Sequence, residues 1–386
     1  MKKLSIYAVV TAATLLSSTA ADISIEQTVR GLGNTPPIWV SLSGISGEAA
    51  EVLQFDLYVQ GFAFTNSAGA QYQISGTSAG NLQARVIDSV TRQALVSKNY
   101  SGASLRRQSH AFADDFVEAL GRKGIARTRL AYKAAAGKNS EIFVADFDGF
   151  NQQPVTADKT IVAAPSWVPG KFGLCFVSYK LGNPAIFHQN LASGARTKVA
   201  YYGGSSISPS VSPDGSRVAM ILSKGGSPDV YVANLDGTDL KRLTTTREAE
   251  SSPCWSADSQ WIGFATEIKG RRTLAKVPAA GGVVKTIPTP GFLNPTEPDW
   301  SPDGKWLAFT SQMRSFRICI VAAEGGTVTE LVEGEDPSWA PNSRTIAFTR
   351  RHSGGRRGLS LLDAPTKQVK DVVRISGNSS QPSWEK

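Results

Sequence analysis

Short apolar runs separated by turn-forming residues occupy most of the chain, and their arrangement repeats. In the clearest copy, residues 297–309, Glu-Pro-Asp-Trp-Ser-Pro-Asp-Gly-Lys leads into the apolar run Trp-Leu-Ala-Phe. The repeat is marked by a proline that recurs every 39 to 45 residues, at Pro165, Pro209, Pro253, Pro298, Pro337 and Pro382. A period of this length, carried by short strands and tight turns, is typical of β-propeller blades with four strands each.

Each copy of the repeat predicts four strands. The first ends at the tryptophan position, and the Pro-Asp-Gly after it forms a tight turn because Pro presets φ and Asp-Gly tolerates positive φ. In the copy that begins at Pro209, the second strand is the apolar run 218–222, the third is 230–232, and the alternating run 239–243 is the outermost.

The two ends of the array complement each other. The last copy stops after its first strand, at residues 381–386, whereas residues 129–132 and 142–146 match the second and third strands of a blade. We therefore expect the C-terminal strand to pair near Leu130 and to close a six-bladed ring over residues 128–386. Closure removes exposed sheet edges.

Residues 22–127 lack the repeat and mix two periodicities. Alternating patterns predict strands, and three-to-four-residue spacing predicts amphipathic helices. The expected strands are 38–42, 72–74, 82–87 and 95–100, and the expected helices are 47–60 and 108–120. The predicted fold class is a small α/β N-terminal domain followed by an all-β six-bladed propeller.

Residues 1–21 have the pattern of a secretory signal peptide. Lys2 and Lys3 precede the apolar run 4–16, and Ser-Thr-Ala at 18–20 offers small residues for cleavage. No later apolar stretch reaches the length of a membrane span. We expect an exported, soluble mature chain without a membrane span.

The tryptophans, cysteines and histidines of the chain do not indicate a ligand cage, a disulfide framework or a metal site. Five tryptophans share one repeat position, which favours packing between blades over an aromatic ligand cage: Trp167, Trp255, Trp300, Trp339 and Trp384. Cys175, Cys254 and Cys319 fall in or beside predicted strands, so buried thiols are expected instead of a disulfide framework. The three histidines are scattered, and we assign no metal, no cofactor and no catalytic residue.

Residues 76–80 match the Gly-x-Ser-x-Gly nucleophile elbow of hydrolases. An elbow must lead from a strand into a helix, but the residues that follow alternate like a strand. A Gly-rich hairpin loop is the expected structure here.

The net charge of +9 is concentrated on the predicted propeller, because residues 21–127 carry as many acidic as basic residues. Every predicted loop between second and third strands carries basic residues: Lys138, Lys180, Lys224, Lys269, Arg271, Arg272, Arg314, Arg350, Arg351, Arg356 and Arg357. These loops share a face with the loops that enter the first strands, and the Asp-Gly turns lie opposite. We expect an electropositive face that suits an acidic partner; the alternative is that these residues only keep the loops soluble. No nucleic-acid motif appears.

Two repeats, Ser-Pro-Asp-Gly-Ser-Arg-Val-Ala at 212–219 and Ser-Pro-Asp-Gly-Lys-Trp-Leu-Ala at 301–308, resemble the propeller repeats of the TolB family. Residues 124–132 and 146–152 resemble the family's link from its α/β domain into the first blade. The resemblance implies a periplasmic protein of the Tol-Pal system. It further implies binding to the lipoprotein Pal through one propeller face and to TolA through the N-terminal segment, in support of outer-membrane integrity and constriction during cell division.

The family's Pal contacts lie in loops that enter the innermost strands. By resemblance, the matching positions are Ser205, Ser208, Ser251, Ser252, Thr296 and Glu297. The basic loops place Lys224, Arg271, Arg272, Arg314, Arg350 and Arg351 on the same predicted face. The segment that would engage TolA begins Asp22, Ile23, Ser24 and Ile25; its alternation equally suits a first strand of the α/β domain. A monomer is expected, and other envelope proteins are possible partners.

Two further functions remain open at this point. One is a hydrolase of the prolyl-oligopeptidase kind, which would need an attached domain with Ser, Asp and His. The other is a propeller that binds a sugar or lipid, which would need aromatic residues at the pore mouth, whereas the loops offer Ser, Thr, Glu and Lys.

Overall fold

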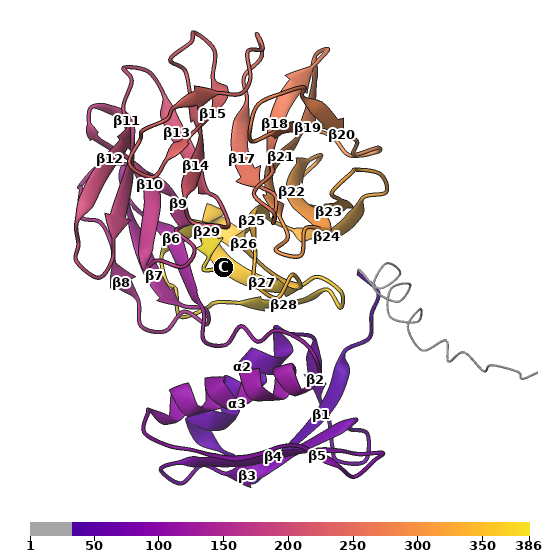
Figure 1. Ribbon diagram of the computed structural model, residues 1–386. Coiled ribbons are helices and arrows are strands. Elements are labelled where there is room, and N and C mark those ends of the chain that lie inside the picture. Colours follow the sequence, from indigo (N-terminus) through magenta and orange to yellow (C-terminus); the bar gives the residue numbers. More distant parts are fainter. Residues whose placement is uncertain (1–32) are drawn as a thin grey trace, which may run out of the picture.

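The computed structural model describes residues 33–386 (Figure 1). The expected signal peptide and the segment Asp22 to Ile25 lie outside the described residues. A five-stranded sheet with two helices forms the first part of the structure, and six four-stranded sheets form the second.

The α/β domain is a mixed sheet covered on one face by two helices, which lie between the sheet and the propeller (Figure 1). Its sheet has the order β2-β1-β3-β4-β5, in which β1 is parallel to β2 and β3 and the other pairs are antiparallel. The elements are β1 (Ile38–Ser43), α2 (Gly47–Tyr58), β2 (Phe62–Phe64), β3 (Tyr72–Thr77), β4 (Leu82–Asp88), β5 (Ala94–Tyr100) and α3 (Leu105–Ala119).

The expected helices and strands of this domain are present, with two differences. Helix α3 begins three residues before the expected start, because Ser104 caps it by accepting a hydrogen bond from the Arg107 amide. Strand β2 was missed because three residues are too short to carry a periodic pattern.

The propeller has six antiparallel blades, and each of the last five is continuous in sequence. The first blade combines β29 (Asn378–Trp384) with β6 (Arg129–Ala136), β7 (Asn139–Asp146) and β8 (Gln153–Pro154). The second is β9 (Val162–Trp167), β10 (Gly173–Leu181), β11 (Asn183–Asn190) and β12 (Arg196–Ala200). The third is β13 (Ser206–Val211), β14 (Arg217–Leu222), β15 (Asp229–Asn234) and β16 (Lys241–Arg242).

The remaining blades follow the same order. The fourth is β17 (Ser251–Trp255), β18 (Trp261–Ile268), β19 (Arg271–Pro278) and β20 (Lys285–Ile287). The fifth is β21 (Pro295–Trp300), β22 (Trp306–Gln312), β23 (Phe316–Ala322) and β24 (Thr329–Glu333). The sixth is β25 (Glu335–Trp339), β26 (Thr345–Arg351), β27 (Arg357–Asp363) and β28 (Gln368–Asp371), with a short 3-10 helix, η1 (Ser353–Gly355), between β26 and β27.

The predicted ring closure is confirmed. Strand β29 pairs antiparallel with β6, and Trp384 lies opposite Leu130 in the register. The innermost strand of the first blade therefore comes from the C-terminus, while its other three strands come from the start of the propeller.

The repeated tryptophans pack between blades, as expected. All five are at most 5% exposed. In three of them the indole N–H donates to a backbone carbonyl of a neighbouring blade: Trp167 to Ser383 at 3.0 Å, Trp255 to Ser210 at 2.8 Å and Trp339 to Asp299 at 3.1 Å. The three cysteines are buried and free, which confirms that prediction.

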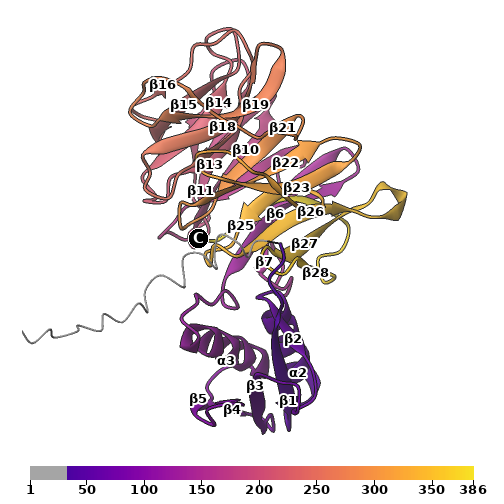
Figure 2. The same ribbon diagram turned by 90° about the vertical axis from the view of Figure 1, so that its right-hand side faces the viewer.

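The α/β domain shares its hydrophobic core with the first and sixth blades (Figure 2). Leu57 and Phe62 belong to the same buried cluster as Leu361 and Trp384. Two hydrogen bonds cross the junction to the sixth blade, from Thr345 Oγ1 to the Val59 carbonyl at 3.1 Å and from Gln368 Nε2 to the Phe62 carbonyl at 3.0 Å. Because the α/β domain covers part of the propeller at this junction, a partner can bind only the propeller surfaces that this domain leaves uncovered.

Candidate functional site

The first strand of every blade carries the same irregularity at the mouth of the central channel. Its pairing with the second strand shifts register in all six blades. The residue before each marker proline has a positive φ of 51° to 55°: Ala164, Ser208, Ser252, Glu297, Asp336 and Gln381. Such φ values are uncommon in residues other than glycine, and a repeated β-bulge is a designed feature of a fold. These six residues line a cavity of about 220 Å³ at the channel mouth.

Side chains of the bulge residues join neighbouring blades. Glu297 Oε2 accepts a hydrogen bond from the Asp336 amide at 3.0 Å, and Asp336 Oδ2 accepts one from the Gln381 amide at 3.2 Å. Gln381 Oε1 in turn accepts from the Ala164 amide at 3.1 Å. Ala164 has no side-chain acceptor, so the series ends there. We call this series the bulge relay.

The bulge relay places two carboxylates close together. Glu297 Oε2 also accepts from Thr310 Oγ1 at 2.7 Å, and Asp336 Oδ2 accepts from Thr349 Oγ1 at 2.9 Å. Burial and the neighbouring carboxylate of Glu297 raise the pKa of Asp336 to about 7. The channel mouth therefore contains a carboxyl group whose pKa lies well above that of an exposed aspartate.

The polar candidates from the sequence lie together around this mouth. Ser208, Ser252 and Glu297 are bulge residues that line the cavity. The other three stand at the adjoining strand starts and are partly exposed: Ser205, Ser251 and Thr296. Ser251 Oγ accepts a hydrogen bond from Arg272 Nη2 at 3.0 Å, which connects the mouth to the basic loops.

The basic candidates lie in or beside the hairpins between second and third strands, on the face that the entering loops share. We call this surface the loop face. Lys224, Arg271, Arg272 and Arg314 are exposed on the third, fourth and fifth blades. Within the described residues, Arg271 and Arg314 take part in no ion pair, so their charges are available to a partner.

Arg350 and Arg351 on the sixth blade are in a different situation. Arg351 binds Glu335 at 2.8 Å, and Arg350 binds Asp371 at 3.2 Å. Arg357 also binds Glu335, at 2.9 Å. Among the described residues, unpaired, exposed cations of the loop face therefore remain on the third to fifth blades, and also at Lys138 on the first blade and Arg356 on the sixth. Loop composition alone did not predict which arginines are paired.

Sequence reasoning also missed the exposed apolar residues of the loop face. Several loops expose a large apolar side chain by 36% to 62%: Leu181, Tyr202, Ile268, Leu293 and Met313. The ammonium of Lys224 lies 4.5 Å from the centre of the Tyr202 ring. Apolar side chains interleaved with arginines are typical of the centres of protein interfaces. The available signal was the adjacency of apolar and basic residues at hairpin tips, as in Met313 and Arg314.

The sequence match to a nucleophile elbow is a hairpin loop between β3 and β4, as expected. A side chain at Gly76 would collide with the backbone oxygen of Gln83, and Gly80 has a φ of 82°. The backbone structure therefore explains why glycine occupies both positions. Ser78 Oγ donates to the Ser46 carbonyl at 3.3 Å on the surface of the α/β domain. The strand-to-helix geometry of a hydrolase elbow is absent at this loop.

Two kinds of feature are absent from residues 33–386. No group of three or more His, Cys, Asp and Glu residues there is arranged to hold a metal ion. No helix in that range has the length and apolar character of a membrane-crossing segment.

Comparison with solved structures supports the fold. A crystal structure of TolB from Acinetobacter baumannii superposes with a TM-score of 0.79 at 21% identity, covering 92% of this chain and 98% of that one. A putative TolB from Agrobacterium tumefaciens superposes with a TM-score of 0.51 at 18% identity, covering 64% and 88%.

Curated sequences that resemble this chain include TolB proteins. A TolB homolog from Chlorobium chlorochromatii is 30% identical over 213 residues, which cover 53% of this chain and 48% of the relative. A Tol-Pal system protein TolB from Francisella tularensis is 33% identical over 162 residues, covering 39% and 37%. The chain thus spans about half or less of the length of the curated relatives it matches. The family model described as the TolB beta propeller domain matches residues 117–386, so the chain belongs to the TolB β-propeller domain family.

Proposed function

We propose that this protein is a non-enzymatic interaction scaffold of the Tol-Pal system in the periplasm. In this role it binds Pal through the loop face and supports outer-membrane integrity and constriction during cell division. Family membership supports the system, since matched relatives carry the name Tol-Pal system protein TolB. The observation that carries the choice of surface is the combination of uncompensated arginines and exposed apolar side chains on the loop face.

The loop face suits an acidic partner for two physical reasons. Exposed cations raise the association rate with an acidic surface and make binding sensitive to salt. Leu293 and Met313, exposed by 62% and 48%, offer apolar surface whose burial stabilises a complex. The Ser and Thr candidates at the channel mouth add hydrogen bonds to the contacts made by the cations and by the apolar side chains.

The choice of face is tested by charge reversal. The variant carries Arg271→Glu and Arg314→Glu together, and a matched control carries Arg85→Glu on the outer side of the α/β sheet. Calorimetric titration with the periplasmic domain of Pal from the same organism is expected to show affinity lowered about tenfold or more in the double variant and unchanged in the control. Equal affinity in all three proteins would discard the loop face as the Pal site.

We further propose that the segment beginning Asp22, Ile23, Ser24 and Ile25 binds TolA by adding a strand to a sheet edge of the partner. Its support is the alternation of polar and apolar residues. A chain that begins at Gly33 is expected to lose TolA binding while it keeps Pal binding. Retention of TolA binding by that shortened chain would refute this part of the proposal.

A further inference from the structure

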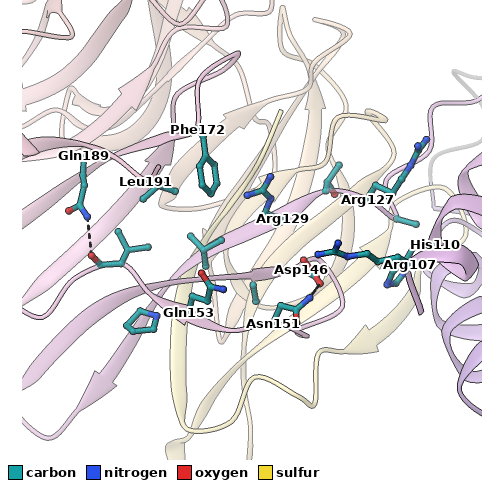
Figure 3. Close-up of a pocket in the computed structure, with 16 residues that line it drawn as sticks. Arg107, His110, Arg127, Arg129, Asp146, Asn151, Gln153, Phe172, Gln189 and Leu191 are labelled. Carbon is teal, nitrogen blue, oxygen red and sulfur yellow. Dashed lines mark hydrogen bonds between the residues drawn. The ribbon is translucent and has the colours of Figure 1, made fainter. Parts of the chain in front are cut away.

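A large cavity lies on the opposite side of the propeller from the loop face. It is a cleft of about 620 Å³ between α3 and the first two blades. Figure 3 shows Arg107 and Arg127 toward the α3 side of this cleft, Arg129 near its middle, and Phe172 and Leu191 toward the second blade.

The cleft continues toward the underside of the central channel. A second cavity of about 200 Å³ shares Arg129 and Phe172 with it and adds Lys171 and Lys386 to the lining. A third cavity of about 260 Å³, at the tryptophan end of the channel, shares Trp167 and Lys386 with the second. The three cavities adjoin one another from α3 to the channel through these shared residues, and together we call them the underside groove.

Five cations line the underside groove, and two of them are unpaired within the described residues. Its cations are Arg107, Arg127, Arg129, Lys171 and Lys386. Arg107 and Lys171 are exposed and form no ion pair within the described residues. The other three cations are paired: Arg127 lies 2.8 Å from Asp114, Arg129 lies 3.4 Å from Glu385, and Lys386 lies 2.9 Å from Asp299. The remaining carboxylate of the lining, Asp146, accepts a hydrogen bond from Asn151 Nδ2 at 2.6 Å.

The groove also has an apolar part. Phe172 is 42% exposed and is held between the Arg129 guanidinium, 4.5 Å from its ring centre, and the stacked ring of Trp167 at 6.4 Å. Val144, Val155 and Leu191 complete this apolar lining. The groove therefore offers both cations and contact surface for apolar side chains.

Beside the apolar lining lies the end of the first blade. Its outermost strand, β8, has only two residues, Gln153 and Pro154, and both are exposed. A two-residue strand that contains a proline offers little backbone pairing to an added strand, so a segment that lies here is held mainly by side-chain contacts.

We propose that the underside groove binds an extended acidic segment of a partner protein. Carboxylates of the segment pair with Arg107 and Lys171, and its apolar side chains pack on Phe172 and Leu191. A compact anion such as phosphate would need donors that converge on one point, whereas these cations are spread from α3 to the C-terminus. Because this groove and the loop face lie on opposite sides, the protein can hold two partners at once.

Fluorescence anisotropy with a defined probe tests the proposal. The probe is a fluorescein-labelled decapeptide of alternating Glu and Val, and a Lys-Val decapeptide is the peptide control. The protein comprises residues 22–386. Arg107→Glu and Lys171→Glu are each expected to weaken probe binding about tenfold, whereas the matched control Arg85→Glu leaves it unchanged. Absence of probe binding, or an equal loss with Arg85→Glu, would overturn the proposal.

Two further measurements test where on the protein the probe binds and whether the groove is free for a partner segment. With the photoreactive residue p-benzoylphenylalanine in place of Gln153, the probe is expected to crosslink to the protein, whereas the same replacement of Ser75 on the outer sheet face gives no crosslink. Reversal of that pattern would contradict the site. Probe binding is expected for residues 22–386 and for a chain that begins at Gly33. Binding to the shorter chain alone would identify the protein's own leading segment as the occupant and would overturn the partner proposal.

Discussion

The indole nitrogen of Trp384 donates a hydrogen bond of 2.8 Å to Oγ1 of Thr128, which lies 256 residues earlier in the chain. Thr128 Oγ1 itself donates to the Ile125 carbonyl at 2.6 Å, so the tryptophan is tied to the segment that leads out of the α/β domain. Trp384 is 1% exposed and belongs to the core shared by both domains. One side chain therefore links ring closure to domain docking.

Replacing Trp384 is expected to destabilise the whole protein. Trp384→Ala should lower the free energy of unfolding by about 3 to 5 kcal/mol, and Trp384→Phe, which loses the hydrogen bond but keeps a ring, by about 1 kcal/mol. Urea unfolding followed by circular dichroism measures both. Trp39→Ala is the control, because Trp39 is 43% exposed. Deleting residues 381–386 should lower the melting temperature further; an unchanged melting curve would refute the closure argument.

Protonation of Asp336 should make stability fall as pH rises toward neutrality. Its pKa is raised from 3.8 to about 7 in the folded state, so between these values the folded protein holds a proton that the unfolded chain has lost. The free energy of unfolding then decreases with rising pH, by at most about 1.4 kcal/mol per pH unit from this one proton.

Asp336→Asn should flatten this pH dependence between pH 4 and 7, because the amide does not titrate. Asn also tolerates the left-handed backbone at this position. The control is Asp239→Asn, an exposed residue with a φ of 54°. Chemical unfolding at several pH values provides the test, and a slope that is identical in wild type and Asp336→Asn would show that this carboxyl does not hold the extra proton.

The bulge relay predicts a stabilising substitution at its end. Ala164 has a φ of 51°, a conformation that is costly for alanine and free for glycine. Ala164→Gly should raise the free energy of unfolding by about 1 kcal/mol. The neighbouring change Ala163→Gly in β9 should lower it by about 0.5 to 1 kcal/mol. If both glycines destabilise equally, the left-handed conformation at position 164 is wrong.

A buried ion pair joins α3 to the turn between β7 and β8. Arg106 and Asp148 are its members, and their side chains are 5% and 1% exposed. Asp148→Asn retains the acceptor for the Phe150 amide but leaves the Arg106 charge without this partner, so it should cost about 3 kcal/mol.

Disrupting an exposed ion pair is the comparison for Asp148→Asn. Lys98→Gln breaks the pair with Asp115, in which the lysine is 58% exposed, and should cost less than about 1 kcal/mol. Thermal unfolding of both variants compares the two losses of stability. Similar small losses would mean that the ion pair between Arg106 and Asp148 contributes little to stability.

The sequence predicted the repeat architecture because each blade carries its own turn chemistry and apolar run. The closure followed from complementary ends, and β29 pairs with β6 as expected. The bulges were not predictable in the same way: the residues with positive φ are Ala, Ser, Glu, Asp and Gln, and no glycine marks them.

Features that depend on contacts between distant residues were also beyond the sequence. The basic loops were predicted, but their neutralisation on the sixth blade depends on Glu335 and Asp371, which only the folded blade brings beside Arg351 and Arg350. The underside groove exists because α3 docks against the first blade, and no local pattern encodes that docking.

The central claim is that this protein is a Pal-binding scaffold. The most direct measurement is calorimetric titration of residues 22–386 with the periplasmic domain of Pal from the same organism, at low and at high salt. We predict a one-to-one complex whose affinity falls as salt rises, because the loop face contributes exposed cations. Absence of measurable binding at both salt concentrations would contradict the account.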